Sequence, residues 1–255
     1  MKDLEKQYYN QKIIWENDIL VNPLEKERVD NIIKLIPKDV VSVLDAGCGS
    51  GVVVNNLPEK FRKVVGIDFS EESLKYVKTE KVLGTIAHLP FDNKSFDLII
   101  CSEVLEHLKD LDYFLAIKEL ERVAKKYIIL TFPNNENLKR SSVICPHCNQ
   151  WFHPYYHVRK FDSKEIKKIF VGFSLQKYQK IGKGQIYIPD FLVPLLFRIR
   201  KPDFLKTSIC PFCGYQDSAR RENAVLSQSS GGFKIKNFLP RKKRWLITFY
   251  TKKQY

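Results

Sequence analysis

Four cysteines occur as two matched pairs in the second half of the chain. The pairs are "CPHC" at 145–148 and "CPFC" at 210–213, each with a proline after its first cysteine. One tight turn presents two thiolates on the same side, and a structural zinc ion takes four ligands in a tetrahedron. We therefore expect one structural zinc ion bound by Cys145, Cys148, Cys210 and Cys213. Two separate redox-active or buried pairs are the alternative that this spacing leaves open.

A glycine-rich turn follows an apolar stretch in the first half. The segment "VLDAGCGSG" at 43–51 passes through Asp45 into three glycines at every second position. Glycine is needed where the backbone turns tightly and a ligand approaches closely. The third glycine comes one residue earlier than in the dinucleotide fingerprint, which favours a nucleoside ligand without a pyrophosphate. Asp68 ends the next apolar run, where a carboxylate can accept hydrogen bonds from both ribose hydroxyls.

The elements that would carry these residues are apolar runs alternating with helical patterns. The predicted strands are 40–47, 63–69, 81–87, 96–102, 127–133, 174–182 and 244–253. The predicted helices are 70–79, which begins with Ser70 as a capping residue, 111–126 and 162–173. This order indicates an α/β fold with a mainly parallel sheet. The alternating pattern of 244–253 suits an edge strand.

The first half resembles the class I S-adenosylmethionine-dependent methyltransferases, in the branch of the ubiquinone and menaquinone biosynthesis methylases. The segments that carry this resemblance lie between about residues 40 and 135: "VLDAGCGSG", "VVGIDFS", "IAHLPFDNKSFDLIICSEVLEHL" and "YIILTFPN". The resemblance implies a seven-stranded Rossmann-like sheet whose last strand is antiparallel. It also implies that S-adenosylmethionine is bound by Asp45, Ala46, Gly47, Cys48, Gly49, Gly51, Asp68, Phe69, Ala87, His88 and Ser102.

The resemblance also assigns roles to these residues. Asp45 through Gly51 would pass under the methionine and the ribose, and Asp68 would bind the ribose hydroxyls. Phe69 would flank the adenine, with Ala87 and His88 at its edge. Ser102 would lie near the methionine end.

In that topology both cysteine pairs emerge at the carboxyl edge of the sheet, where ligands of open α/β sheets bind. We expect residues 1–140 to form the cofactor-binding core. Residues 141–160 and 183–240 would be zinc-bound insertions that meet as a basic lid. Residues 161–182 and 241–255 would complete the sheet.

Positive charge is concentrated in the half that carries the cysteine pairs. Residues 141–255 contain 22 lysines and arginines against 6 acidic residues, a net charge of +16 in a chain whose total is +14. Such a region is either a solvated surface or a face for anionic partners. The segment 191–201, with Arg198, Arg200 and Lys201, is predicted as a buried lid helix or as a peripheral contact with an anionic membrane.

The first residues of the chain show no secretory pattern. The longest apolar stretch of the whole sequence, 186–199, is too short to span a bilayer. We expect a cytoplasmic protein whose reduced thiolates are available to zinc. Cys48 and Cys101 lie in apolar segments and are predicted to be buried without a metal role.

Methyl transfer needs in-line positioning and, for some oxygen acceptors, a base. The candidate bases are His88, Glu103 and His107, with His153 and His157 near the first cysteine pair. The same "EVLEHL" segment is a routine helix start in this family, so a structural role is the competing interpretation. We expect a small-molecule or lipid-linked acceptor.

Two alternative functions remain open. Glu103, Glu106 and His107 resemble a Glu-x-x-Glu-His motif with which small-RNA 2′-O-methyltransferases hold a divalent metal at a terminal ribose. In that interpretation His153 or His157 would be the distant ligand. The second alternative is a non-catalytic zinc-ribbon binding module on a methyltransferase fold, against which the intact glycine turn and Asp68 argue.

Overall fold

A seven-stranded sheet forms the centre of the molecule. The computed structural model describes residues 2–16, 20, 22–186, 204, 207–217 and 241–254. The strand order is β3-β2-β1-β4-β5-β11-β8, with β11 antiparallel to both neighbours and the other neighbouring pairs parallel. The strands are β1 Ser42–Ala46, β2 Lys63–Asp68, β3 Glu80–Leu83, β4 Phe96–Ser102, β5 Ala124–Pro133, β8 Phe173–Ile181 and β11 Trp245–Lys252. The predicted α/β fold with a seven-stranded sheet is confirmed.

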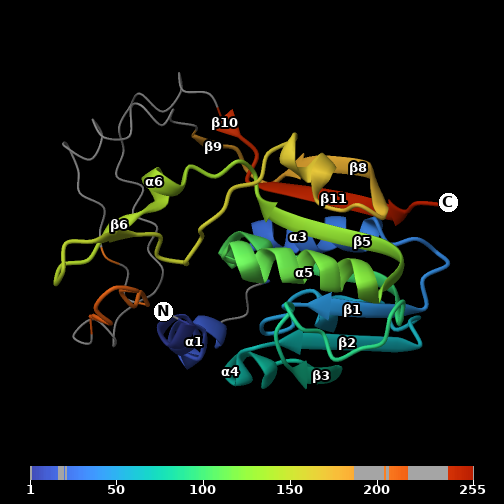
Figure 1. The fold of residues 1–255 in the computed structure, drawn as a ribbon, viewed down its shortest axis with the longest axis horizontal. Coiled ribbons are helices and arrows are strands. Elements are labelled where there is room, and N and C mark those ends of the chain that lie inside the picture. The colour runs from blue at the N-terminus through green and yellow to red at the C-terminus, as the bar shows by residue number, and fades with distance from the viewer. Residues whose placement is uncertain are drawn as a thin grey trace.

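Helices cover both faces of this sheet (Figure 1). Ala116 and Leu120 of α5 (Asp110–Val123) pack on one apolar face, and Val29 and Ile32 of α3 (Pro23–Lys34) pack on the other. The remaining α-helices are short: α1 Lys2–Tyr9, α2 Lys12–Trp15, α4 Glu71–Leu74 and α6 Leu138–Ser141. The molecule is therefore a three-layer arrangement in which the two largest apolar clusters lie on opposite faces of the sheet.

The sequence pattern of the last strand predicted an edge position, and this prediction is wrong. β11 is inserted between β5 and β8, and β8 forms the edge. Residues Trp245 to Thr248 are all buried, so both faces of β11 are covered at that end. Alternation along a strand reports one-sided burial, and it does not reveal which strands flank it.

Several predicted elements are shorter than expected. The segment 162–173 contains a 3₁₀ turn, Glu165–Lys168, and no α-helix; Ile166 still packs into the core from this turn. The helix predicted for 70–79 is reduced to α4, although Ser70 caps it by accepting a hydrogen bond from the Ser73 amide at 3.1 Å. A single sequence cannot exclude that a short turn buries the same apolar residues as a helix.

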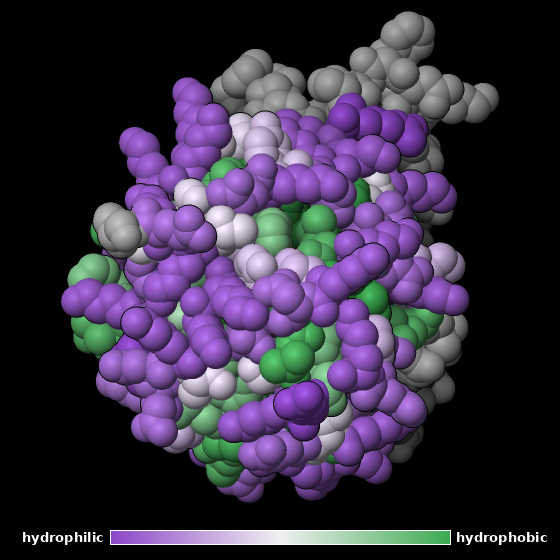
Figure 2. All heavy atoms as spheres, turned by 90° about the vertical axis from the view of Figure 1, so that its right-hand side faces the viewer, coloured by the Kyte–Doolittle hydropathy of each residue, from purple (hydrophilic) through white to green (hydrophobic). Residues whose placement is uncertain are grey.

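The segments that carry the cysteines lie beyond the carboxyl end of β5, on the same side as α1 (Figure 1). Two small two-stranded ladders occur there or nearby: β6 Val143–Ile144 with β7 Trp151–Phe152, and β9 Gln185–Ile186 with β10 Arg241–Lys242. The face on the right-hand side of Figure 1 is largely hydrophilic, with apolar side chains in small groups (Figure 2).

No helix in the described part of the chain is both long and apolar enough to cross a membrane. The segment with Arg198, Arg200 and Lys201 lies outside the described residues, so its predicted lid or membrane role stays a prediction.

Candidate functional site

The turn after β1 depends on glycine. Gly47 has a φ angle of 78°, and a Cβ atom there would lie 2.5 Å from Cγ2 of Val104. The amide of Gly49 donates a hydrogen bond to Oδ2 of Asp68 at 2.8 Å, which ties the end of β1 to the end of β2. This turn forms one wall of a cleft of about 980 Å³, including space open to solvent.

Asp68 is buried at the end of β2 but reaches the wall of this cleft. Its Oδ1 accepts hydrogen bonds from the Ser70 amide at 2.9 Å and from the Ser73 hydroxyl at 3.3 Å. Burial raises the pKa of Asp68, while the backbone hydrogen bonds from Ser70 and Gly49 oppose that rise. The carboxylate is thus held in a fixed orientation by the backbone of two turns.

Asp45 and Arg28 also line the cleft. Asp45 accepts a hydrogen bond from the Val54 amide at 3.1 Å, and burial raises its pKa to about 7. Arg28, from α3, is buried, donates to the hydroxyl of Ser102, and pairs with Glu25 at 2.9 Å. The cleft therefore contains a carboxyl group that changes its protonation near neutral pH and that interacts with the cationic Arg28.

The N-terminal helices cover the cleft, which the sequence did not indicate. Trp15 lies against the glycine turn, since a Cβ atom on Gly49 would be 3.0 Å from its ring. The ring of Tyr9 packs edge-on against Phe69 at 5.5 Å between centroids. The Ser70 hydroxyl donates to the Tyr9 carbonyl at 2.9 Å, so this segment is held to the turn after β2.

The predicted cofactor residues fall into two groups. Those lining the cleft are Asp45, Gly47, Cys48, Gly49, Asp68, Phe69 and Ser102. Those outside the lining are Ala46, Gly51, Ala87 and His88; His88 is exposed to solvent. Thr85 and Ile86 line the cleft instead, because β3 ends at Leu83 and the chain turns toward the cleft there.

The four paired cysteines come together although 62 residues separate the pairs. Their Sγ atoms all lie within 4.8 Å of one another, with Cys145 to Cys213 at 3.7 Å and Cys148 to Cys210 at 3.6 Å. Both turns use the same backbone pattern: the amides of Asn149 and Gly214 donate to the carbonyls of Cys145 and Cys210. Cys48 and Cys101 are free and buried in the core, as predicted.

The cysteine turns contact the N-terminal helices. The rings of Tyr8 and Tyr156 lie 5.0 Å apart, and both pack with Ile209. The side chain of Gln11 donates to the Thr207 carbonyl at 2.9 Å. Within the described residues, the cysteine turns contribute nothing to the cleft lining, whereas α1 and α2 do. The N-terminal segment therefore lies between the cysteine turns and the cleft.

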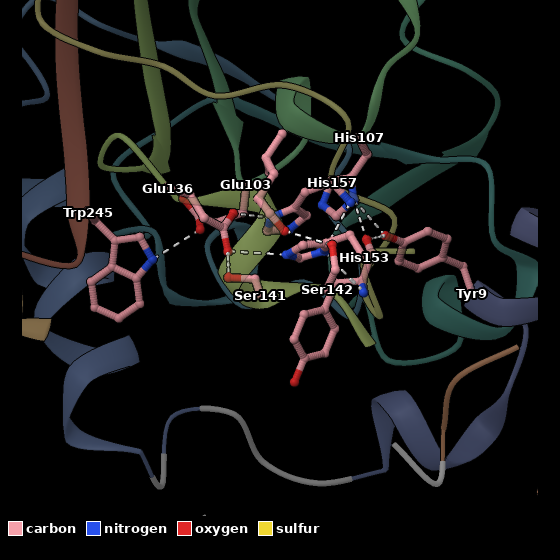
Figure 3. Close-up of polar contacts among 11 residues, drawn as sticks. Tyr9, Glu103, His107, Glu136, Ser141, Ser142, His153, His157 and Trp245 are labelled. Carbon is pink, nitrogen blue, oxygen red and sulfur yellow. Dashed lines mark hydrogen bonds and ion pairs between the residues drawn. The ribbon is translucent and has the colours of Figure 1, made fainter. Parts of the chain in front are cut away.

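A cluster of carboxylates and histidines lies next to this cleft (Figure 3). Glu136, in the turn after β5, accepts from Nε2 of His153 at 3.2 Å and from Nδ1 of His157 at 2.5 Å. Burial alone would raise the pKa of Glu136, but the hydrogen bonds from these two histidines bring it below its usual range. His107 lies beside His157 with ring centroids 4.6 Å apart, and its own pKa is lowered to about 3 by burial.

Glu103, the first residue of the predicted metal motif, is not part of either acid–histidine group and forms hydrogen bonds with other residues. It accepts from the Thr131 hydroxyl at 2.9 Å and from Nε1 of Trp245 at 3.0 Å (Figure 3). Of the residues considered for a metal site, Glu106, His107 and His157 lie close together, and each has one possible ligand atom within 4.8 Å of those of the other two. Among the candidate bases, Glu103 and His107 line the cleft and His88 does not.

Residues 44–130 match the family model of a methyltransferase domain. The chain is 32% identical over 134 residues to malonyl-[acyl-carrier protein] O-methyltransferase 1 of Coxiella burnetii, covering 51% of this chain and 45% of that protein. It is 32% identical over 112 residues to ubiquinone biosynthesis O-methyltransferase of Pelagibacter ubique, covering 40% and 46%.

The chain is therefore similar, over residues 44–130, to a methyltransferase domain. It spans about half the length of the curated relatives it matches. A methyltransferase of Thermotoga maritima, described as a possible histamine N-methyltransferase, has the same fold, with a TM-score of 0.56 at 18% identity over 99% of this chain and 100% of that one. The small RNA methyltransferase HEN1 also shares the fold, with a TM-score of 0.54 at 17% identity over 91% of this chain and 26% of that one.

Proposed function

We propose that this chain transfers a methyl group from S-adenosylmethionine to a small-molecule or lipid-linked acceptor. The observation that carries the proposal is the position of Asp68 beside the glycine turn, in a cleft that Phe69 also lines. The methyltransferase domain makes a cofactor of this class the natural ligand of that cleft. The intact cleft argues against a non-catalytic binding module.

The residues of the cleft fit this cofactor. Asp68 offers carboxylate oxygens to ribose hydroxyls, and Phe69 offers a partly exposed ring to a flat base. Asp45, when ionised, complements the cationic methionine end. The bound cofactor supplies a methyl group already activated by its sulfonium.

The chain itself has to align the acceptor and exclude water. Tyr9 and Trp15 cover the cleft, and Glu103 with His107 lines the wall that follows Ser102. Alignment of this kind can supply roughly 7–11 kcal/mol of a barrier. Because burial keeps His107 neutral, its free ring nitrogen can accept a hydrogen bond or bind a cation, but it is a weak base.

An oxygen atom on an anionic molecule is the acceptor that the observations favour. Two relatives are named as O-methyltransferases. A recess beside Asn134 and Asn135 is lined by Asp162 and by five cationic residues, among them Lys164, Lys180 and Arg241; this excess of positive charge suits a phosphate or carboxylate group. The net charge of +16 over residues 141–255 supports the same conclusion.

The terminal ribose of an RNA is a second candidate acceptor. The observation that favours it is the grouping of Glu106, His107 and His157, which could hold a cation against ribose hydroxyls. An RNA acceptor would bind more weakly as salt rises, with a slope near −0.7 per phosphate contact on a single strand. It would also lose activity when its terminal 2′-hydroxyl is removed.

We also propose that the four cysteines hold a structural zinc ion. Tetrahedral geometry with Zn–S bonds of about 2.3 Å places the sulfurs about 3.8 Å apart. The Sγ separations of 3.6 and 3.7 Å are close to that value and well above the length of a disulfide.

The proposed function is tested by incubating the protein with fractions of cell extract and isotope-labelled S-adenosylmethionine, followed by mass spectrometry. Label in a small molecule or lipid supports the first candidate, and label at an RNA 3′ end supports the second. Failure to label any fraction while the protein still binds the cofactor would contradict both acceptor classes.

A further inference from the structure

The basic recess beside the end of β5 lies at the same edge of the sheet as the cleft. Because β11 is antiparallel to its neighbours, the ends of β5 and β8 and the start of β11 meet at this edge. The recess occupies about 750 Å³, including space open to solvent. Its five cationic lining residues are Lys164, Lys180, Arg241, Lys242 and Lys243. Segments that are distant in the sequence therefore contribute to one hollow.

Backbone contacts fix two of these segments to the end of β5. The amide of Asn134 donates to the Arg244 carbonyl at 2.9 Å, and its side-chain nitrogen donates to the Lys243 carbonyl at 2.9 Å. The amide of Asn135 donates to the Phe161 carbonyl at 2.8 Å. The segment before β11 and the segment before the 3₁₀ turn that precedes β8 are thereby held against β5. The position of the recess is therefore set by the fold.

The recess has a large excess of positive charge. Among the described residues its one acidic lining residue is Asp162, whose Oδ1 accepts from the amides of Lys164 at 2.7 Å and Glu165 at 3.0 Å. These backbone hydrogen bonds lower the pKa of Asp162, so the carboxylate is ionised and engaged in its own turn. In the described part of the chain, no ion pair joins Lys164, Lys180 or Arg241 to a carboxylate. Cations gathered in one hollow repel one another, and an anion bound among them offsets this repulsion.

A line of contacts joins the recess to the cleft. Arg244 follows the last lining residue of the recess, and its guanidinium carbon lies 4.7 Å from the centroid of the Trp245 ring. Nε1 of Trp245 donates to Glu103 at 3.0 Å, and Glu103 lines the cleft (Figure 3). The two hollows are therefore linked by packed side chains along one edge of the sheet.

The strand register sets the distance between the recess and the cleft. Ser102 at the end of β4 pairs with Thr131 of β5, which pairs with Ile247 of β11. Ile247 in turn pairs with Gln179 of β8, the neighbour of Lys180. Neighbouring strands lie about 4.8 Å apart, so Lys180 lies about 14 Å from the end of β4 and the middle of the recess about 10 Å from it. A compact molecule in the cleft does not reach across this distance.

We propose that the basic recess binds a terminal phosphate or pyrophosphate group of the methyl acceptor, about 10 Å or more from the atom that receives the methyl group. A phosphate monoester carries nearly two negative charges and three strong acceptor oxygens at neutral pH, which suits cations that converge from several segments. A carboxylate has one charge and two oxygens, which a single arginine can satisfy. The acceptor is accordingly an elongated molecule with a charged end. Its use of the recess rests on the proposed methyl transfer, whereas the binding of phosphate by the recess does not.

Binding is tested by calorimetric titration of the full chain with inorganic pyrophosphate at low ionic strength. We expect one site per chain, and Lys164→Gln with Lys180→Gln should weaken it at least about tenfold, because two charge-assisted contacts are lost. Lys168→Gln with Lys177→Gln is the matched control, since it makes the same change in net charge at exposed lysines outside the recess lining. The control should bind like the wild type. No binding by the wild type, or equal weakening in both double variants, would overturn the proposal.

The acceptor role is tested by labelling cell-extract fractions with isotope-labelled S-adenosylmethionine. Treatment of the fractions with phosphatase should remove the label, and at limiting acceptor the recess variant should label at least about tenfold less than the control variant. Partition of the labelled product between organic and aqueous phases distinguishes a lipid-linked phosphate from a soluble one. Labelling that persists after phosphatase treatment and in the recess variant would overturn this role.

Binding of S-adenosylmethionine separates failure of this inference from failure of the proposed function. Both double variants should keep the cofactor affinity and the far-UV circular dichroism of the wild type, because their lysines do not line the cleft. A wild-type chain that binds pyrophosphate but not the cofactor would support the recess as a phosphate site and contradict the proposed methyl transfer.

Discussion

The cofactor cleft and the neighbouring acid–histidine cluster, defined as Glu106, His107, Glu136, His153 and His157, share a wall but are assembled in different ways. Asp45 and Asp68 lie at the carboxyl ends of the parallel strands β1 and β2 and are held by the backbone of adjacent turns. The cluster joins three segments that meet through side chains, including one that follows the first cysteine turn. Ligand binding in the cleft should therefore depend on the sheet, whereas the cluster should depend on the folding of the cysteine turns.

The largest expected effect is that of zinc removal, which should disrupt the acid–histidine cluster and leave the sheet that forms the cleft folded. Binding of zinc stabilises small zinc domains by up to about 10–16 kcal/mol. We expect Cys210→Ser with Cys213→Ser to reduce zinc from one ion to none per chain and to disorder the cysteine turns, while the far-UV circular dichroism of the sheet persists. Elemental analysis and circular dichroism measure these outcomes. Cys48→Ala is the control and should keep its zinc; zinc retained in the double variant would show that the two pairs do not share an ion.

A smaller effect is expected from pH at Asp45, which lines the cleft. Burial raises the pKa of Asp45 to about 7, so the carboxyl is mostly neutral at pH 6 and mostly ionised at pH 8. A cationic ligand favours the ionised form, and its affinity should rise roughly tenfold over this range and then level off. Calorimetry with S-adenosylmethionine at several pH values measures this rise. Asp45→Asn should lack the part of the rise due to this carboxyl; identical pH profiles in both proteins would contradict the assignment.

The smallest expected effect concerns the contact between the two regions. Tyr9 lines the cleft, and its hydroxyl forms hydrogen bonds with Nδ1 of His107 and with the Tyr155 carbonyl. Tyr9→Phe removes these hydrogen bonds, and the free energy of unfolding should fall by about 0.5–1.5 kcal/mol. Denaturant titration measures this change. Tyr178→Phe, at an exposed position on β8, should change it by less than about 0.5 kcal/mol; equal changes in both variants would mean that the contact contributes nothing specific.

The same contrast explains how much could be predicted from the sequence. Asp45, Gly47 and Asp68 follow apolar runs directly, and parallel strands bring their carboxyl ends to one edge, so local motifs are sufficient to bring them together. The resemblance named Ala87 and His88, whereas Thr85 and Ile86 line the cleft, because β3 ends at Leu83 and this end cannot be recognised from its sequence. The site assignments drawn from the resemblance stay predictions.

The contacts of the N-terminal segment could not be predicted. "MKDLEKQYYNQK" mixes acids, bases and tyrosines without a distinctive period, and Tyr9 meets His107 across 98 residues. Glu136 gave no signal either, because a single acidic residue in a turn has no pattern of its own. By contrast, Asn22 before Pro23 is a recognisable helix start, and it could have drawn attention to α3 and therefore to Arg28.

Calorimetric titration of the wild-type chain with S-adenosylmethionine tests the central claim most directly. We predict one binding site per chain, with Asp68→Ala costing about 1.5–3 kcal/mol, roughly tenfold or more in affinity, because a charged acceptor for two hydroxyls is lost. Asp110→Ala, which removes an exposed carboxylate paired with Arg159, should bind like the wild type. No heat of binding from the folded wild-type chain, or equal affinities for wild type and Asp68→Ala, would contradict the account.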